Sequence, residues 1–369
     1  MASETKPLLE DEALIPPAPF ARSLALASSS PSSSSSSSTP KRLPQAIAHR
    51  GFKSLYPENT ILAFRAALKA GAHALETDLH LSQDGVVVLS HDGNLKRCFG
   101  VDKKINECDW EYLETLETVR EPRQKMPRLE DLLGFLSEGE EGREAVWVLL
   151  DIKTDDPPAE LLSRVAQVLA KTPGPVPWNK RIVLGCWNKP YINHVQTHLP
   201  TYPISLISWS PIYARKFLSS SQPNLSFNMF QKSLVGPVGK RFVRKLKKED
   251  RKLFVWTVND EEWMEWSIGA EVDGVITDDP ELFLEVCRRW EGGGGDAPVA
   301  RSLSPEEETA RVARRAGRVR DGTWKRTLKL YLEVVGVQIL VHVFTPILML
   351  VARFGVVGPG PKMTKALKL

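Results

Sequence analysis

The sequence has few residues that could form disulfides or a thiolate metal site. Only four of its 369 residues are cysteine, and they are scattered, without a CxxC pair or a histidine cluster beside them. This pattern is typical of reduced structural thiols in an intracellular protein, and disulfides or a zinc site are the alternatives. We also expect no secretory signal, because residues 1–12 are polar and acidic.

The small net charge hides an asymmetry along the chain. The total is +4, but from residue 311 to the C-terminus twelve Lys and Arg face two acids, a balance of +10 that leaves −6 for residues 1–310. A mildly acidic body argues against a nucleic-acid-binding core and places the attraction for anions in the tail.

Composition divides the chain into four regions. Residues 1–43 are rich in serine and proline and are predicted to be disordered. Residues 44–290 are close to the roughly 250 residues of one (β/α)₈ barrel. A Gly-, Glu- and Arg-rich linker follows over residues 291–323, and residues 324–369 form a hydrophobic tail.

Short apolar runs alternate with helical stretches over residues 44–290. The run 146–150 is apolar without alternation, as in a parallel strand buried on both faces. Helices are predicted to start at Thr60, after Pro127, at Asp260 and at Pro280. Eight strands with intervening helices predict an α/β fold of the TIM barrel class. The predicted strands are 46–49, 74–79, 146–152, 181–186, 204–208, 226–229, 253–258 and 274–277.

Charged side chains gather at the ends of the first three predicted strands, where barrel enzymes carry their active sites. They are His49 and Arg50 on the first strand, Glu76 and Asp78 on the second, and Asp151 and Lys153 on the third. Glu76 and Asp78 are two residues apart and therefore point to the same face of their strand. Such close carboxylates repel unless a cation lies between them, and hard oxygen ligands suit Mg²⁺ or Ca²⁺. We predict a metal site with Asp151 as third ligand; a solvated pair at a sheet edge is the alternative.

A hairpin is predicted after the second strand, with Asp84-Gly85 as a two-residue turn. That register places His91 opposite Asp78, on the same face. Histidine, with a pKa of about 6.5, serves as acid or base near neutral pH. His49 and His91 are therefore predicted to be the acid and base of a metal-dependent phosphodiester hydrolase, with Arg50 and Lys153 on the phosphate. The alternative for any single histidine is a core or surface role.

At these positions the chain resembles the glycerophosphodiester phosphodiesterase family. The shared motifs are His49-Arg50-Gly51, Pro57-Glu58-Asn59-Thr60, Ala63-Phe64, Gly71-Ala72, Glu76-Thr77-Asp78, Asp84-Gly85, His91-Asp92, Leu150-Asp151-Ile152-Lys153, Trp256-Thr257-Val258-Asn259 and the segment 273–280. The resemblance implies a TIM barrel and the same catalytic, phosphate-binding and metal-binding roles for the matching residues. The wider family more often has glutamate at the position of Asp151. This aspartate, the segment 185–187 and the hydrophobic tail look most like the fungal phosphatidylglycerol-specific phospholipase C branch.

Three functions follow from the resemblance and the residues. The first is a phospholipase C that converts phosphatidylglycerol to diacylglycerol and glycerol phosphate. The second is a glycerophosphodiester or lysophospholipid phosphodiesterase that releases an alcohol head group, and the third is an inactive lipid-binding barrel. Glu58 and Trp256 are further candidates for the substrate pocket. Glu58 could orient Arg50 or be a structural loop residue, and Trp256 could line the head-group pocket or pack on the barrel rim. Surface or capping roles are predicted for His73, His80, His194 and His198.

The tail predicts attachment to a membrane. Residues 334–352 read VVGVQILVHVFTPILMLVA, nineteen residues without a formal charge, and eight basic residues precede them between 311 and 329. A C-terminal anchor is expected, with an in-plane helix or a buried partner helix as alternatives. The expected partners are a phospholipid substrate and an anionic membrane surface, without nucleic acid. The expected location is the endoplasmic reticulum, the mitochondrial outer surface or a lipid droplet.

Overall fold

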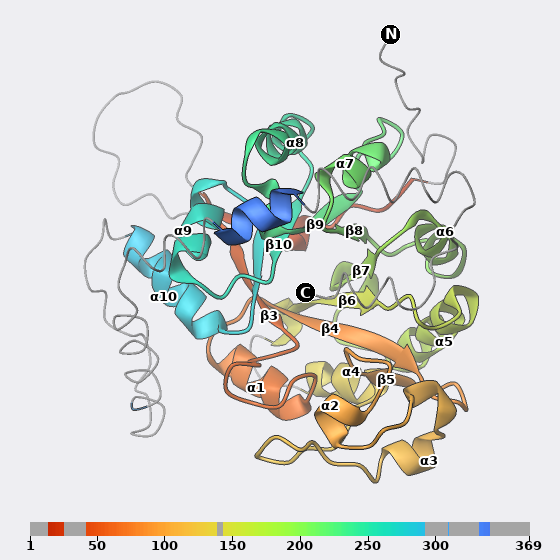
Figure 1. The fold of residues 1–369 in the computed structure, drawn as a ribbon. Helices are drawn as coiled ribbons and strands as arrows, with labels where there is room; N and C mark the ends of the chain where they lie inside the picture. The colour runs from red at the N-terminus through yellow and green to blue at the C-terminus, as the bar shows by residue number, and fades with distance from the viewer. Residues whose placement is uncertain (1–13, 26–41, 139–142, 292–308, 310–331, 340–369) are drawn as a thin grey trace.

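The structure is a computed structural model that describes residues 14–25, 42–138, 143–291, 309 and 332–339. Eight parallel strands form a closed barrel at its centre (Figure 1). They are β3 (Gln45–His49), β4 (Ala74–Leu81), β6 (Trp147–Ile152), β7 (Ile182–Cys186), β8 (Ile204–Ser208), β9 (Ser226–Phe230), β10 (Leu253–Trp256) and β11 (Gly274–Thr277). β3 pairs with both β11 and β4, which closes the ring. The predicted TIM barrel is confirmed, and each predicted strand overlaps an observed one.

Helices cover the outside of this barrel. They are α1 (Ile61–Lys69), α4 (Leu129–Ser137), α5 (Pro158–Lys171), α6 (Lys189–His198), α7 (Pro211–Ala214), α8 (Pro237–Lys248), α9 (Glu261–Gly269) and α10 (Pro280–Glu291). The four predicted helix starts are confirmed. At α1 the hydroxyl of Thr60 accepts a hydrogen bond from Ala63 N at 3.2 Å, which satisfies one of the free N–H groups of the first turn.

Inward-facing side chains form an apolar floor inside the barrel. The buried cluster includes Ile47, Ala74, Trp147, Leu149, Val183, Phe254 and Ile276. Because side chains two residues apart share a face of a strand, His49 follows Ile47 on the inner face and Asp151 follows Leu149. The polar residues at the strand ends therefore lie directly above an apolar floor.

The N-terminal end of the barrel is closed by a segment that we predicted to be disordered. Ile15 is 1% exposed and its backbone bonds to Gln222 and Asn224, and the Phe20 ring lies 5.9 Å from that of Trp147. The prediction of disorder is therefore wrong for residues 14–25, because a few apolar side chains among many polar ones suffice to cover the floor.

This segment is held by a short sheet and a 3₁₀ turn. The turn η1 spans Pro19–Ala21, and β1 (Leu24–Ala25) pairs antiparallel with β2 (Arg42–Leu43). The prediction of disorder is thus also wrong for residues 42 and 43. The rest of the region 1–43 lies outside the described residues.

Between β4 and α4 the chain forms an insertion, residues 82–127, at the bottom of Figure 1. It contains β5 (Val87–Leu89), α2 (Lys96–Phe99), the 3₁₀ turn η2 (Ile105–Glu107) and α3 (Trp110–Leu113). It has a small core of its own, which includes Val88, Leu95, Ile105, Cys108, Leu113 and Met126. Cys108 is a free thiol, as are the other three cysteines.

β5 pairs antiparallel with β4, so the predicted hairpin is confirmed, but the predicted register is wrong by one residue. The observed pairs, such as Leu79 with Leu89, place Ser90 and not His91 opposite Asp78, and Ser90 N donates to Asp78 O at 3.0 Å. The reason is a three-residue loop in which Gly85 has a φ of +81°, a conformation that favours glycine.

At the C-terminal end, residues 332–339 form a helix, drawn in blue in Figure 1. None of the described helices is long and apolar enough to cross a membrane. The predicted membrane segment 334–352 lies largely outside the described residues, as do nearly all of the linker 291–323 and most of the tail.

Truncation of Ile15 tests whether the N-terminal segment contributes to the fold. Ile15→Ala should lower the free energy of unfolding by about 2–5 kcal/mol, because it removes a buried side chain and leaves a cavity. The neighbouring Leu14 is 61% exposed, and Leu14→Ala should change the free energy by less than about 0.5 kcal/mol. Urea unfolding measures both, and equal effects of the two substitutions would contradict the assignment.

Candidate active site

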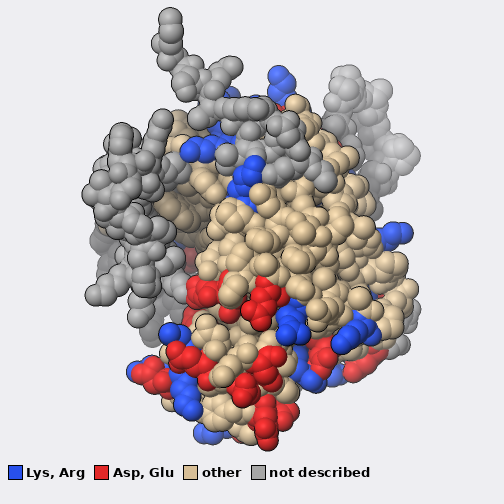
Figure 2. All heavy atoms as spheres, turned by 90° about the vertical axis from the view of Figure 1, so that its right-hand side faces the viewer, with Lys and Arg blue, Asp and Glu red and all other residues tan. Residues whose placement is uncertain are grey.

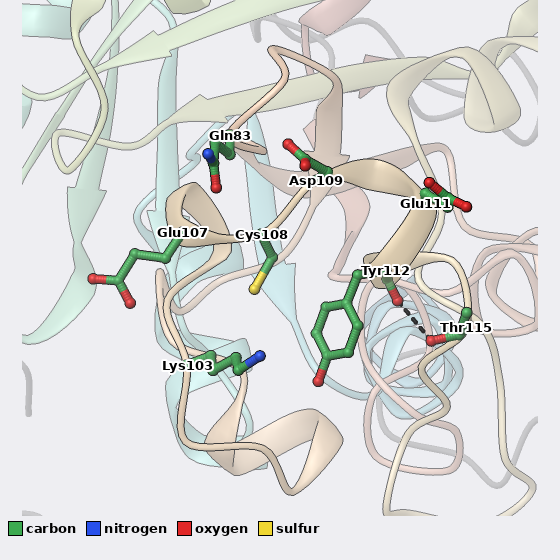
Figure 3. Close-up of a pocket in the computed structure, with 8 residues that line it drawn as sticks. All are labelled: Gln83, Lys103, Glu107, Cys108, Asp109, Glu111, Tyr112 and Thr115. Carbon is green, nitrogen blue, oxygen red and sulfur yellow. Dashed lines mark hydrogen bonds between the residues drawn. The ribbon is translucent and has the colours of Figure 1, made fainter.

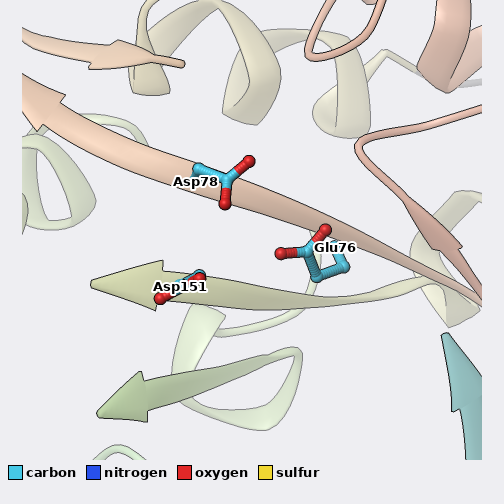
Figure 4. Close-up of side chains that lie close together, drawn as sticks. All are labelled: Glu76, Asp78 and Asp151. Carbon is cyan, nitrogen blue, oxygen red and sulfur yellow. The ribbon is translucent and has the colours of Figure 1, made fainter. Parts of the chain in front are cut away.

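Strand register brings the predicted metal ligands together at the C-terminal end of the barrel. His49 pairs with Glu76 across β3 and β4, and Asp78 pairs with Asp151 across β4 and β6. The ligand oxygens of Glu76, Asp78 and Asp151 all lie within 4.8 Å of one another, and the three residues are buried. Figure 4 shows these carboxylates on their two neighbouring strands.

Two cations lie against these carboxylates. Lys153 Nζ is 2.6 Å from both Asp78 Oδ1 and Asp151 Oδ2, and Arg50 Nε is 3.1 Å from Asp78 Oδ2. Burial raises the pKa of Asp78, but the opposing effect of Lys153 and Arg50 is greater and holds this pKa well below its usual value. Burial and the charge of Asp78 raise the pKa of Glu76 well above its usual value.

This arrangement fits a divalent metal. The donors are hard carboxylate oxygens, which suit Mg²⁺ or Ca²⁺. A cation bound among them would oppose the burial and the repulsion from Asp78 that raise the pKa of Glu76. Three carboxylates and two cations sum to −1, so a divalent ion would bring the set to +1, the charge that matches one phosphodiester anion. The geometry thus supports a divalent-metal site without selecting the ion.

His49 is oriented by an acid that the sequence analysis did not single out. Its Nδ1 lies 2.5 Å from Asp278 Oδ1, and its Nε2 lies 4.0 Å from Glu76 Oε2. Burial and the nearby Arg50 lower the pKa of His49 to about 4, although Asp278 opposes this change. Asp278 follows β11, so the strand-end rule that found His49 would also have found it.

His91 belongs to the insertion and reaches the same rim. Its Nδ1 lies 2.8 Å from Asp92 Oδ1, while burial lowers its pKa despite this partner. The charge of Asp78 also acts on its pKa, so His91 lies near the metal ligands although the predicted cross-strand pairing was wrong. The chain leaves the β5 ladder at Ser90, which frees His91 from that register.

One exposed arginine connects the two halves of this polar network. Arg97 on α2 donates to Asp92 at 2.6 Å and to both oxygens of Glu58 at 2.7 Å. Glu58 in turn accepts from Arg50 Nη1 at 2.8 Å. Glu58 therefore orients Arg50, which is one of the two roles predicted for it, and Arg97 ties Arg50 to the His91 loop.

The loop after β3 has three residues with positive φ angles. Arg50 and Asn59 have positive φ angles of 57° and 56°, and Gly51 has 83°. A Cβ on Gly51 would meet Ala63 at 2.7 Å, so the loop needs glycine here. Asn59 donates to Asp78 Oδ2 at 2.9 Å, a role that the shared motif at residues 57–60 did not reveal.

Aromatic residues follow the strands on the other side of the rim. Trp187 follows β7, Trp209 follows β8, and Phe230 and Trp256 end β9 and β10. The Trp256 ring lies 5.8 Å from Trp187 and 5.3 Å from Phe230, and it also packs on the barrel floor. Trp187 Nε1 donates to Asp151 Oδ1 at 2.8 Å, which links this group to a metal ligand.

The rim therefore has two contiguous halves. In the order of the closed sheet, β11, β3, β4 and β6 are neighbours and carry the acids, cations and His49, whereas β7, β8, β9 and β10 are neighbours and carry the aromatic residues.

His80 does not have the surface or capping role that was predicted. It is 1% exposed, its Nδ1 lies 2.8 Å from Asp156 Oδ2, and its Nε2 lies 3.4 Å from the His91 carbonyl. The prediction was wrong because the partner, Asp156, is distant in sequence. His80 thus contacts the backbone of the loop that carries His91.

A groove of about 530 Å³ lies on the insertion and is separate from this site (Figure 3). It is lined by Gln83, Lys103, Glu107, Cys108, Asp109, Glu111, Tyr112 and Thr115, none of which belongs to the rim. In Figure 2, acidic and basic side chains are interspersed over the lower part of the molecule, at the height of the insertion. The ion pairs of the insertion include Lys96–Asp102 and Lys104–Glu107.

The metal site can be tested by calorimetry with Mg²⁺ and Ca²⁺. Glu76→Gln should weaken binding of the preferred ion at least about tenfold, because it removes one charged oxygen from a set of three. Glu111→Gln, on the exposed surface of the insertion, serves as the control and should leave the affinity unchanged. Equal affinities of the two variants would contradict the assignment.

Trp187 should position Asp151 for the metal. Trp187→Phe keeps an aromatic ring beside Trp256 but removes the N–H that binds Asp151, so metal affinity should fall about 10–100-fold. Trp256→Phe is the matched control, because the Trp256 N–H donates to Asn228 O and not to a metal ligand. If both variants bind metal like the parent, Trp187 has no positioning role.

The comparisons with known proteins point to one enzyme family. The pattern of the Glycerophosphoryl diester phosphodiesterase family matches residues 49–282. A glycerophosphodiester phosphodiesterase of Caldanaerobacter subterraneus is 27% identical over 248 residues, which cover 66% of this chain and 97% of the relative. A lysophospholipase D of Homo sapiens is 46% identical over 72 residues, 20% of this chain and 22% of the relative.

A solved structure agrees with these relatives. The glycerophosphodiester phosphodiesterase of Thermotoga maritima has a TM-score of 0.54 and 26% identity, and the alignment covers 66% of this chain and 98% of that one. With the barrel, the acidic triad and the two histidines in place, the chain belongs to the glycerophosphoryl diester phosphodiesterase family and is a phosphoric diester hydrolase.

Proposed function

We propose that this hydrolase acts on an acylated glycerophospholipid, and that phosphatidylglycerol is cut to diacylglycerol and glycerol phosphate. The observation that carries the proposal is the division of the barrel mouth into a charged and an aromatic half. A small, fully polar diester would place no apolar group of its own against the aromatic half. A lipid places its phosphate near the charged half and its acyl-bearing glycerol near the aromatic half.

The charged half can carry out this reaction in two steps. The head-group glycerol of phosphatidylglycerol has a hydroxyl next to the phosphoester carbon. One of His49 and His91 removes the proton of this hydroxyl, whose oxygen then bonds to phosphorus as the bond from phosphorus to the diacylglycerol oxygen breaks. The other histidine protonates that departing oxygen. Water then opens the cyclic glycerophosphate by the reverse use of the two histidines.

Cations in the charged half support both steps. Arg50 Nε is buried and has no hydrogen-bond partner in the described structure, although it lies 3.1 Å from Asp78. A phosphate oxygen would supply that partner. Lys153 can neutralise a second oxygen. A bound divalent metal would supply Lewis acidity at the phosphoryl group.

A second candidate is release of an alcohol head group from a lysophospholipid or a glycerophosphodiester. The observation that favours it is the 46% identity with part of a human lysophospholipase D. The chemistry would be the same, except that the free hydroxyl would belong to the lipid glycerol and the head group would depart. The aromatic half favours the first candidate, because in that reaction the departing group carries the acyl chains.

We also propose that the protein works at an intracellular membrane, at the endoplasmic reticulum, the mitochondrial outer surface or a lipid droplet. The support is the uncharged sequence 334–352 with the basic residues that precede it.

Product analysis distinguishes the two candidates. Purified protein with Mg²⁺ or Ca²⁺ should convert phosphatidylglycerol vesicles to diacylglycerol and glycerol phosphate. His49→Ala and His91→Ala should each reduce the rate about 10²–10⁴-fold, whereas His198→Ala, on α6 outside the site, should have little effect. Formation of phosphatidic or lysophosphatidic acid instead would favour the second candidate.

The cyclic step has a test of its own. Phosphatidylpropanol lacks the attacking hydroxyl and should resist hydrolysis, and a cyclic glycerophosphate should be detectable by phosphorus NMR during turnover of phosphatidylglycerol. Hydrolysis of phosphatidylpropanol at a similar rate would contradict the route and indicate direct attack by water.

A further inference from the structure

We propose that α8 and the 332–339 helix together form a surface that binds an anionic lipid membrane beside the aromatic half of the catalytic rim. This inference concerns the placement of the barrel on the membrane, and it holds whichever phosphodiester bond is cut. Its parts are a basic face on α8, an exposed apolar stripe on the 332–339 helix, and the contacts that join the two.

α8 is strongly basic on its outer side. Its sequence, PVGKRFVRKLKK, has six basic residues and no acid. Lys245 pairs with Glu249 and Lys247 with Glu271, which leaves four exposed basic residues without an acidic partner in the described structure. These four are Lys240, Arg241, Arg244 and Lys248.

These four side chains share one face of the helix. At about 100° per residue they fall within an arc of about 100°. The buried residues Phe242, Val243 and Leu246 occupy the opposite side and pack on the barrel. The unpaired charges therefore point away from the protein together and not in several directions.

The 332–339 helix lies against the loop between β9 and α8. Lys232 forms an ion pair with Glu333, and the Gln338 amide donates to Val235 O at 2.6 Å and to Lys232 O at 3.2 Å. Val334 packs against the barrel core. These contacts hold the helix at the start of α8, across the ends of β9 and β10 in Figure 1.

The other side of this helix is apolar and exposed. Leu332, Gly336 and Ile339 are exposed and, at spacings of four and three residues, lie on one stripe. Leu332 is 59% and Ile339 50% exposed. Val238, near the start of α8, is 40% exposed. Three of the seven exposed large apolar residues in the described structure thus gather in this one place.

An anionic membrane is the partner that fits both features. Unpaired basic side chains attract anionic head groups, and an apolar stripe beside them can enter the interface between head groups and acyl chains. A nucleic acid would match the charges but would leave Leu332 and Ile339 against phosphates. The sequence that continues from residue 340 to 352 is uncharged, which suits the same surroundings.

The position of this surface connects it with the active site. The 3₁₀ turn η6 (Gln231–Leu234) begins directly after Phe230 and contains Lys232, one of the residues that hold the 332–339 helix. From Phe230 the rings of Trp256 and Trp187 continue to Asp151. An acyl chain that leaves the membrane here would meet aromatic side chains all the way to the metal ligands.

The surface can be mapped with an environment-sensitive fluorophore on the full-length protein. In a Cys98→Ser background, the label is attached to Val238→Cys, and in a matched protein to Val119→Cys, which is 54% exposed on the insertion. With vesicles of phosphatidylcholine and phosphatidylserine, the Val238 label should shift to the blue and the Val119 label should not. A water-like Val238 label on vesicle-bound protein, or no vesicle binding at all, would overturn the proposal.

The charges are tested by two double variants. Arg241→Gln/Arg244→Gln removes two unpaired charges of α8 and should weaken sedimentation with these vesicles about 30-fold, since each charge near an anionic surface contributes about fivefold. Lys69→Gln/Lys171→Gln removes two exposed charges at the ends of α1 and α5, away from α8, and should have a much smaller effect. Equal effects, or none for the first pair, would overturn the basic face as the contact.

These experiments are independent of the proposed function, because phosphatidylserine is not the proposed substrate and neither fluorescence nor sedimentation measures turnover. Both double variants should also unfold in urea like the parent, which confirms that the barrel is folded. Vesicle binding without lipid hydrolysis would contradict the proposed function and leave this surface supported.

Discussion

Glu76, Asp78 and Asp151 place three carboxylates in a space that excludes most water, beside the cations Arg50 and Lys153. A buried charge without a partner costs several kcal/mol, so each of these groups depends on the position of the others. Their positions follow from the pairing of three neighbouring strands, in which Asp78 lies opposite Asp151. A slip of one residue in any of these strands would turn its charged side chain into the apolar layer around the barrel.

The apolar floor limits the access of water to this charge cluster. Trp147, Leu149 and Phe254 fill the barrel beneath the rim, and the N-terminal segment closes the opposite end with Ile15 and Phe20. Water therefore reaches the charges mainly from the mouth. In these surroundings the pKa of His49 falls to about 4 and that of Glu76 rises, because burial disfavours the charged form of each.

The barrel mouth is formed by the ends of the barrel strands and by the insertion. The charged half comes from the barrel strands and is completed by the insertion, which supplies His91 and, through Arg97, braces both Glu58 and Asp92. The aromatic half comes from the ends of β7 to β10. Trp187 touches both, since its ring packs near Trp256 and its N–H binds Asp151. The aromatic half and a candidate metal ligand are thereby coupled through one side chain.

The sequence by itself determined the barrel, its eight strands, the hairpin and the residues of the acidic triad. These features depend on hydrophobic periodicity and on residues two apart on one strand, such as Glu76 and Asp78, which are local properties of the chain. The tertiary structure alone decided which distant groups meet: Asp278 with His49, Asp156 with His80, and Ile15 with Gln222. It also decided the hairpin register, because Gly85 adopts a left-handed conformation in a three-residue loop. Contacts between residues 76 to 229 positions apart leave no local pattern, since they arise only when the strands close into a ring.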